Sequence, residues 1–383
     1  MNLVKEKYMF FLLIFIIYPV GCFYIGWRFL DWAKSFIQLS GIVFWPVWTI
    51  LAATPILPRM AARTGIRWPE PGAVGDWVLA VVYMAVILWL LSDLARLISN
   101  SWSVIPEVVK TIRFQGSLVT ALLICILGYG SWNATNPVVV RYELTIDKHI
   151  SGLDSIKAVL VSDIHAGRVV GAKRIEQLAT ALISLNPDIV FYAGDIIDND
   201  ADYADKNNLL LPLANVKPKL GSYAVLGNHE YIGGQGGAAE ALLRKTGMHV
   251  LRDDKILIRD MIYVVGRDDR SAGVYRNAVR KPLRELMQDV NKTLPVILLD
   301  HQPNSLQEAV ENEIDLQVSG HTHKGQFFPN NLIVERMYEQ AWGYLRKGGL
   351  QLIVSSGYGT WGPPIRIGSR AEIVELTIHF KNP

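Results

Sequence analysis

Two hydrophobic patterns divide the 383-residue chain near residue 138. Before this point, long and nearly uncharged apolar runs cover residues 9–25, 36–57, 74–91 and 117–132. Each run is about as long as a helix must be to cross a hydrocarbon layer of ~30 Å. After this point, apolar stretches are short and alternate with amphipathic segments. The pattern predicts an all-α transmembrane region of about four helices over residues 1–137 and a separate folded domain over residues 138–383.

Short strands alternate with helices in the second region. Apolar, β-branched stretches predict strands at residues 157–161, 188–192, 222–226, 295–299 and 314–318, and each stretch stops at a polar loop. Helical periodicity covers residues 172–185, 238–246, 276–289 and 304–311. Strands that alternate with helices predict a layered α/β domain. Because a polar loop follows every predicted strand, we expect a sheet whose C-terminal edge carries a functional site.

The loops after these strands hold five short motifs. In chain order they are Asp-Ile-His at 163–165, Gly-Asp-Ile-Ile-Asp at 194–198, Gly-Asn-His-Glu at 227–230, a single histidine at 301 and Gly-His-Thr-His at 320–323. Five of the eight histidines of the chain lie in these motifs, which makes a chance clustering implausible. Carboxylate, imidazole and amide groups without thiolates are ligands for hard or borderline divalent cations. The set predicts a site for two metal ions.

The ordered motifs resemble those of the calcineurin-like metallophosphoesterase superfamily, which reads DxH, GDxxD, GNH(E/D), H and GHxH. The resemblance extends from about residue 138 to the C-terminus, and residues 356–366 are similar to a membrane-associated bacterial subgroup. It implies two packed mixed sheets flanked by helices. It also implies a first metal held by Asp163, His165 and His323, a second held by Asn228, His301 and His321, and a bridging carboxylate from Asp195.

Phosphate ester hydrolysis needs a site of this kind, because an anionic nucleophile must attack an anionic substrate. Two divalent ions about 3.5–4 Å apart clamp the phosphoryl oxygens and lower the pKa of a bound water towards ~7, so that hydroxide forms at neutral pH. Mixed nitrogen and oxygen ligands favour transition metals such as Mn, Fe or Zn over Mg or Ca.

Further residues have expected roles near the metals. The resemblance implies that His229 faces the leaving-group oxygen, where it either donates a proton or stabilises developing charge, and that Asp198 orients His229. Asp198 has an alternative role as a turn-capping residue after its strand. Three basic residues that follow the motifs or lie in the tail loop are candidate substrate contacts, or else solvated loop charges: Arg168, Lys324 and Arg366.

The combined patterns predict a membrane-anchored, dinuclear-metal phosphohydrolase. Four membrane spans exceed what a tether requires, which favours a lipid-linked phosphate ester such as UDP-diacylglucosamine. One alternative is a broad phosphodiesterase or phosphatase for soluble nucleotides. Another is a non-catalytic membrane binding or transport protein, which the lack of paired charges within the apolar runs argues against.

Charge and cysteine content add little to this picture. The formal net charge is +3 and no basic tract occurs, so no nucleic acid partner is expected. A small excess of basic residues on the N-terminal side of the runs favours a multi-pass protein of the inner membrane with a cytoplasmic catalytic domain. The first run could instead be a cleaved signal peptide, although no small-residue cleavage pattern follows it. Both cysteines, Cys22 and Cys125, lie in apolar runs and indicate no redox compartment.

Overall fold

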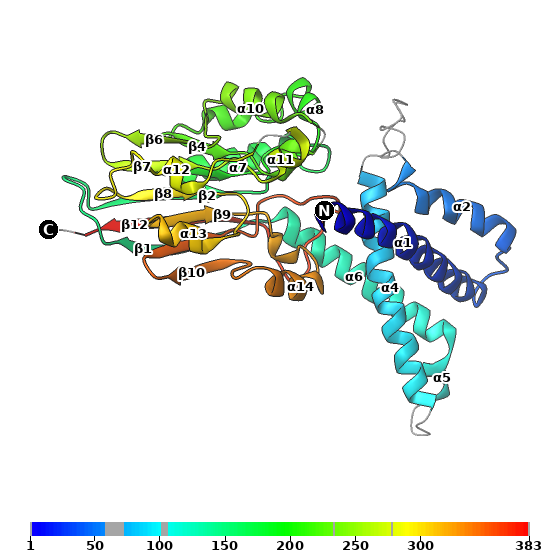
Figure 1. The fold of residues 1–383 in the computed structure, drawn as a ribbon. Helices are drawn as coiled ribbons and strands as arrows, with labels where there is room; N and C mark the ends of the chain where they lie inside the picture. The colour runs from blue at the N-terminus through cyan, green and yellow to red at the C-terminus, as the bar shows by residue number, and fades with distance from the viewer. Residues whose placement is uncertain (1, 58–72, 101–105, 233, 277–278, 382–383) are drawn as a thin grey trace. The chain divides into compact units, whose positions relative to one another are not determined.

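The computed structural model describes residues 2–57, 73–100, 106–232, 234–276 and 279–381 (Figure 1). The side chains of residues 2–15, 73 and 100 lie outside the described part. The chain forms two compact units, Met1–Gly130 and Ser131–Pro383. The functional boundary that we predict after residue 137 stays a prediction.

The first unit forms helices over most of each predicted apolar run, although residues 36–40 and 54–56 are not helical. Its helices are α1 (Asn2–Lys34), α2 (Gly41–Ala53), α4 (Ala73–Asn100), α5 (Glu107–Lys110) and α6 (Ile112–Thr135). Among the described residues, two helical stretches are long and apolar enough to cross a membrane, Val74–Ser99 and Ile112–Thr135. With 13 residues, α2 is shorter than the ~20 residues that a span requires. The total of four spans therefore stays a prediction.

An acidic and a basic side chain pair within this unit, just past the ends of the predicted apolar runs 9–25 and 74–91. Arg28 of α1 donates to the Asp93 carboxylate of α4, inside the apolar stretch Val74–Ser99. Tyr24 donates to the other Asp93 oxygen over 2.5 Å, and the Arg28 guanidinium lies 4.4 Å from the centre of the Trp89 ring. Partnering of this kind offsets the desolvation of both charges, so the pair joins α1 to α4.

The second unit contains two mixed sheets of six strands each among the described residues. The first sheet has the order β1 (Val138–Ile146), β12 (Glu372–Phe380), β2 (Ser155–Val161), β3 (Ile189–Ala193), β4 (Ser222–Val225) and β5 (His249–Val250). The second has the order β10 (Gly343–Lys347), β11 (Leu350–Val354), β9 (Leu316–Ser319), β8 (Val296–Leu299), β7 (Ile262–Gly266) and β6 (Asp254–Ile258). Strands β2 to β5 run parallel, as do β7, β8, β9 and β11.

Alternation along the strands builds a layered core. In β2, Ala158 and Leu160 point into a buried cluster that both sheets share, whereas Val159 and Val161 point to the other face. Helices cover both outer faces (Figure 1). Against the first sheet pack α7 (Ala172–Leu185), α8 (Ala201–Lys206) and α10 (Gly236–Lys245); against the second pack α12 (Leu283–Leu286) and α13 (Leu306–Glu311).

The predicted two-sheet α/β fold is confirmed, and all five predicted strands form. The single sheet that the strand pattern alone suggested is wrong, because β2, β3 and β4 lie in one sheet and β8 and β9 in the other. The predicted helix over residues 276–289 is also wrong. The chain forms α11 (Ser271–Arg276) and then α12, because Pro282 cannot donate within a helix and disfavours helical backbone before it.

Candidate metal centre

The five motifs meet where the two sheets end side by side. Strands β2, β3 and β4 lead from the first sheet into the loops at 163–165, 194–198 and 227–230. Strands β8 and β9 lead from the second sheet to His301 and to the loop at 320–323. Parallel strands put their carboxyl ends at one edge, so residues 160 positions apart become neighbours.

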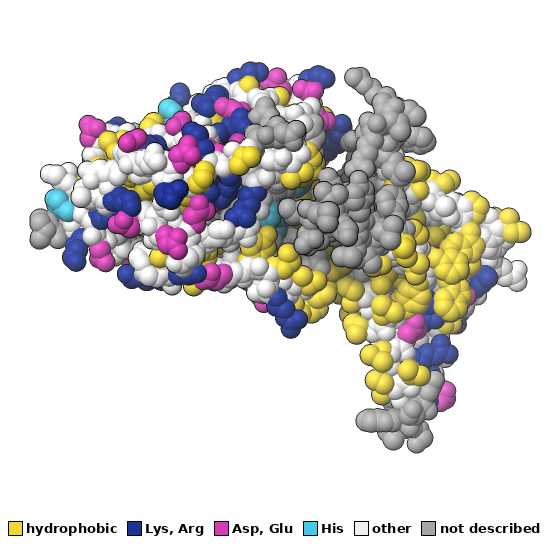
Figure 2. All heavy atoms as spheres, viewed as in Figure 1, with side chains coloured by type: hydrophobic (Ala, Val, Ile, Leu, Met, Phe, Trp, Pro, Cys, Tyr) yellow, Lys and Arg dark blue, Asp and Glu magenta, His cyan; other side chains and the backbone are white. Residues whose placement is uncertain are grey.

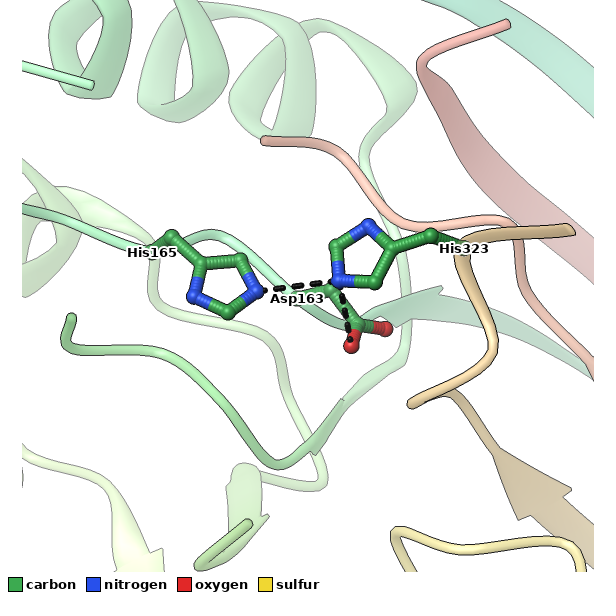
Figure 3. Close-up of side chains that lie close together, drawn as sticks. All are labelled: Asp163, His165 and His323. Atoms are coloured by element: carbon green, nitrogen blue, oxygen red, sulfur yellow. Dashed lines mark hydrogen bonds and ion pairs between the residues drawn. The ribbon is translucent and has the colours of Figure 1, made fainter. Parts of the chain in front are cut away.

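A first group consists of Asp163, His165 and His323 (Figure 3). The Nε2 atoms of His165 and His323 lie 3.0 Å apart. Oδ1 of Asp163 lies 3.3 Å from Nε2 of His323. All three side chains are buried, so water does not solvate these closely spaced polar atoms. One cation between them would supply the missing partner.

A second group consists of Asp195, His301 and His321. Nε2 of His301 lies 3.1 Å from Oδ2 of Asp195 and 3.3 Å from Oδ1 of Asn228. Nδ1 of His301 lies 2.7 Å from the Ala193 carbonyl oxygen, which fixes Nδ1 as the donor and leaves Nε2 facing the site.

Asp195 lies between the two groups, because it also forms a group with His165 and His229. Burial opposes its charge, but His301 and His229 hold the pKa of Asp195 well below its usual value. Burial lowers the pKa of His301, yet the charge of Asp195 raises that pKa well above its usual range. A proton on His301 thus offsets the negative charge of the nearby carboxylates. A bound cation at this position could offset the same charge.

The imidazoles of His321 and His323 are in the neutral form that binds metals. Burial and the neighbouring His301 lower the pKa of His321 to about 3. Burial and the neighbouring His165 hold the pKa of His323 well below its usual value. Metal binding needs neutral imidazoles and ionised carboxylates and releases protons such as that of His301. The donor types present, carboxylates, imidazoles and an amide without thiolates, fit two divalent cations.

The backbone around the site is strained. Five candidate ligands have φ between 48° and 71°, which is rare for residues other than glycine: Asp163, His165, Asp195, His321 and His323. A side chain at Gly227 would clash with the Asp195 carboxylate, and one at Gly320 would clash with Asp163. These glycines of the GNH and GHxH motifs let the loops approach the ligands closely.

His229 and Asp198 form a pair beside the two groups. Nδ1 of His229 lies 3.0 Å from Oδ1 of Asp198, and the two imidazole rings of His229 and His165 are 4.4 Å apart between centroids. Burial favours a neutral ring, but the charge of Asp195 and the hydrogen bond to Asp198 raise the pKa of His229 to about 9. The ring therefore holds a proton at neutral pH, with Nδ1–H directed at Asp198.

Sequence reasoning gave no role to Glu230, although it lies in the GNHE motif. Its carboxylate accepts hydrogen bonds from the backbone N–H groups of Gly227 at 2.7 Å, Ile197 at 2.8 Å and Asp195 at 3.1 Å. It therefore ties the loop after β3 to the loop after β4. Its position three residues after Gly227, as in a capping box, is the signal that could have identified it.

Arg366 does not lie where a substrate contact was expected. The side chain is fully buried, and its Nη2 lies 2.6 Å from the Gly359 carbonyl oxygen and 3.2 Å from Nδ1 of His323. It donates to the Gly357 carbonyl oxygen as well. These hydrogen bonds hold the loop at residues 356–366 against the loop that carries His323.

The other two basic candidates lie nearer the surface. The Arg168 guanidinium lies over the Tyr203 ring, 4.3 Å from its centre, and 3.9 Å from Asp200. Nζ of Lys324 lies 3.7 Å from the centre of the Trp342 ring. Contact of either residue with substrate stays a prediction.

Comparison with known proteins agrees with this geometry. Residues 156–325 match the family model of the calcineurin-like phosphoesterases. A transmembrane protein with metallophosphoesterase domain from Danio rerio is 32% identical over 80% of this chain and 72% of its own length. The chain belongs to the calcineurin-like phosphoesterases. An uncharacterized metallophosphoesterase from Aquifex aeolicus is 35% identical over 63% of this chain and 92% of its own.

Among solved structures, a dimetal phosphatase from Danio rerio aligns with 60% of this calcineurin-like phosphoesterase and all of its own chain, at a TM-score of 0.36 and 13% identity. The family membership confirms the predicted enzyme class, a metal-dependent phosphoesterase. The name of the Danio rerio transmembrane relative and the two long apolar helices fit a membrane protein.

Proposed function

We propose that this calcineurin-like phosphoesterase hydrolyses phosphate esters at a membrane with two transition-metal ions. The observation that carries the proposal is the position of Asp195, whose carboxylate belongs to donor groups on both sides. Asp163, His165 and His323 would hold one ion, and Asn228, His301 and His321 the other. When bound, the ions neutralise phosphoryl charge and acidify a water molecule. Nitrogen and oxygen donors without thiolates suit Mn, Fe or Zn.

The residues beside this cluster supply proton transfer. Because Nδ1 of His229 donates to Asp198, the remaining proton of the charged ring is on Nε2. That atom can pass its proton to the oxygen of the departing group. The Asp198 carboxylate holds the ring orientation and favours its charged form, so Asp198 acts through His229 as a positioning residue.

For the substrate, we propose a lipid-linked phosphate ester, of which UDP-diacylglucosamine is one candidate. The apolar helices that fit a membrane protein support this choice. The alternative is a broad phosphodiesterase or phosphatase for soluble nucleotides. We further propose an inner-membrane, multi-pass protein with a cytoplasmic catalytic unit, on the small excess of basic residues described above.

The test of the proposed reaction uses p-nitrophenyl phosphate and bis(p-nitrophenyl) phosphate with the full chain in detergent. Chelated protein should be inactive on both esters, and addition of Mn²⁺ should restore turnover of at least one. Zn²⁺ and Mg²⁺ serve as comparison metals. Full activity after exhaustive chelation would contradict the metal mechanism, and no turnover with any metal would contradict the hydrolase proposal.

Asp198→Asn is expected to lower turnover by about 10- to 100-fold while both metals stay bound. The amide keeps an oxygen near Nδ1 of His229 but removes the negative charge that raises its pKa. Since the protonated ring is the active form, loss of activity on the basic side should begin at a lower pH than in the unaltered protein. The measurements are turnover as a function of pH and the metal content of each variant. Asp202→Asn, at an exposed position, is the control. An unchanged pH profile would exclude the positioning role.

The catalytic unit is expected to work without the first unit. A chain that starts at Ser131 should keep its turnover of soluble esters, because every candidate ligand and both sheets lie beyond that residue. It should lose most of its turnover of a bilayer-embedded ester, since anchoring to the membrane raises the effective concentration of the enzyme at that substrate. Equal loss on both substrates would mean that the helices support the fold, and no loss on either would argue against the lipid-linked substrate.

The residue at which the truncated chain begins should affect the stability of the catalytic unit. The last turn of α6 belongs to the catalytic unit: Nδ2 of Asn133 donates to the Arg366 carbonyl oxygen over 3.3 Å, and Ala371 N–H donates to the Asn133 carbonyl oxygen over 3.2 Å. A chain that starts at Val138 loses both bonds, so its free energy of unfolding should fall by about 1–3 kcal/mol relative to the Ser131 start. Urea unfolding of the two chains measures the difference, and equal midpoints would show that this turn contributes nothing.

A further inference from the structure

An unusual helix lies beside the candidate metal centre. None of the residues of α14 (Asn330–Met337) is buried, although it carries several large apolar side chains. Leu332 is 50% exposed, Ile333 57% and Met337 68%. Isolated exposed apolar residues are common, but a helix that leaves all of them uncovered needs a partner.

Two more exposed aromatic side chains belong to the same surface. Phe328 is 49% and Trp361 44% exposed. Gln326 joins their segments, because its side chain donates to the Trp361 carbonyl oxygen and accepts from the Trp361 N–H, both over 3.1 Å. Together these five residues form an apolar rim, which consists of Phe328, Leu332, Ile333, Met337 and Trp361. Figure 2 shows hydrophobic side chains gathered over α14.

The apolar rim is attached directly to the loop that carries candidate ligands. The start of α14 packs against Gly325, at the end of the turn that contains His323. Just beyond the other end of the helix, the Tyr338 ring lies 6.1 Å from the His321 ring. The exposed apolar surface and the candidate metal centre are therefore neighbours on one loop system of the second sheet.

We propose that the apolar rim inserts into the interfacial layer of a lipid bilayer and that the site takes its phosphate ester from that layer. A short helix that exposes both apolar and charged side chains, here Glu335 and Arg336, suits this role, since such helices lie in the interface with their apolar side chains about 5–10 Å deep and their charges at the headgroups. The chain itself supplies the proximity: α6, long and apolar enough to span, ends at Thr135, and only Asn136 and Pro137 separate it from β1.

This inference specifies the substrate class of the proposed function: an amphiphilic phosphate ester whose apolar part stays in the bilayer. The substrate part of the inference rests on the proposed function, whereas the docking part does not. Two measurements on the full chain, reconstituted in vesicles of phosphatidylcholine and phosphatidylglycerol, separate them.

The docking measurement places an environment-sensitive fluorophore on Met337→Cys, after Cys22 and Cys125 have been replaced by alanine. Asp289→Cys is the control position, because its side chain is 93% exposed and lies outside the apolar rim, seven residues before β8 in the chain. Nitroxide-labelled lipids should quench the probe at residue 337, and aqueous iodide should quench the probe at residue 289. Iodide quenching at both positions would overturn the docking proposal. Protection of residue 337 from both quenchers would also overturn it, since it would indicate a protein partner.

The substrate measurement compares methyl and hexadecyl p-nitrophenyl phosphate, which share the scissile bond. Replacing Leu332, Ile333 and Met337 together by glutamine should lower turnover of the vesicle-borne hexadecyl ester by about tenfold or more. The same variant should turn over the methyl ester within about twofold of the unaltered protein. Ile183→Gln, an exposed apolar residue near the end of α7, is the matched control and should change neither rate.

The outcomes distinguish the two proposals. Equal turnover of the hexadecyl ester by the triple variant and the unaltered protein would overturn the role of the apolar rim. Loss on both esters would also overturn it, because the helix would then support the fold of the site. If the unaltered protein hydrolyses neither ester, the proposed function fails, while the quenching result still decides whether the rim meets lipid.

Discussion

Asp195→Ala is expected to abolish turnover of every phosphate ester that the protein accepts. The carboxylate is buried and lies within reach of both donor groups, with Oδ2 only 3.1 Å from Nε2 of His301. Without it, the two candidate ions would share no ligand. No negative charge would then offset the repulsion between the two cations. Metal content should therefore fall from two ions per chain to one or none. Elemental analysis after gel filtration and turnover of a p-nitrophenyl ester measure both effects.

A failure of folding must be separated from a failure of chemistry in this experiment. Asp195 Oδ1 also accepts a hydrogen bond from the His229 N–H over 2.8 Å, so alanine leaves that donor unpaired. Asp195→Asn keeps the shape and an acceptor, and should fold as the unaltered protein does while still lacking the bridging charge. Asp205→Ala, whose surface ion pair with Lys245 contributes little, is the control. Two ions per chain in a folded Asp195→Asn variant would show that another residue bridges the metals.

His229→Ala is expected to lower turnover by about 10²–10⁴-fold, the range for a positioned acid or base, while both ions stay bound. The ring follows Asn228 in the chain, yet its Nδ1 is directed at Asp198, 3.0 Å away, rather than at either metal group. The loss should be smaller for a substrate whose leaving group needs no proton. Turnover of p-nitrophenyl and alkyl esters at equal metal content measures this difference.

The control for His229 is His249→Ala, because His249 stacks on Tyr223 at 5.3 Å between ring centroids and lies outside every motif. It should retain the full rate. Loss of a metal ion from the His229 variant would identify His229 as a ligand, and an equal loss for both leaving groups would exclude proton donation.

The sequence predicts the elements that end at the site better than it predicts their arrangement. A strand such as β3 (Ile189–Ala193) is buried on both faces, so an unbroken apolar stretch marks it clearly. The polar residues that follow must form a loop, and their order alone indicated the metal chemistry. Strand pairing depends on contacts between distant segments, such as β12 between β1 and β2, that no local pattern records.

The less accurate predictions share a physical cause. Arg366 looks like an ordinary loop cation, because sequence does not reveal the carbonyl oxygens of Gly357 and Gly359 that surround it in the fold. Sequence does not reveal the role of Glu230 for the same reason, since its three partners are backbone N–H groups from two loops. Buried polar groups are stabilised by partners that only the tertiary structure supplies.

The continuity of α6 sets a rule for exchanging membrane regions among such enzymes. The helix Ile112–Thr135 contains both an apolar stretch and Asn133, so helix geometry sets the phase of its apolar side chains relative to Asn133. Inserting one residue before Ser131 would rotate that phase by about 100°, whereas inserting seven would shift it by only about 20° and lengthen the helix by two turns. If the proposed docking to lipid holds, a swap made in register should keep turnover of a vesicle-borne ester, whereas a swap out of register should lower it.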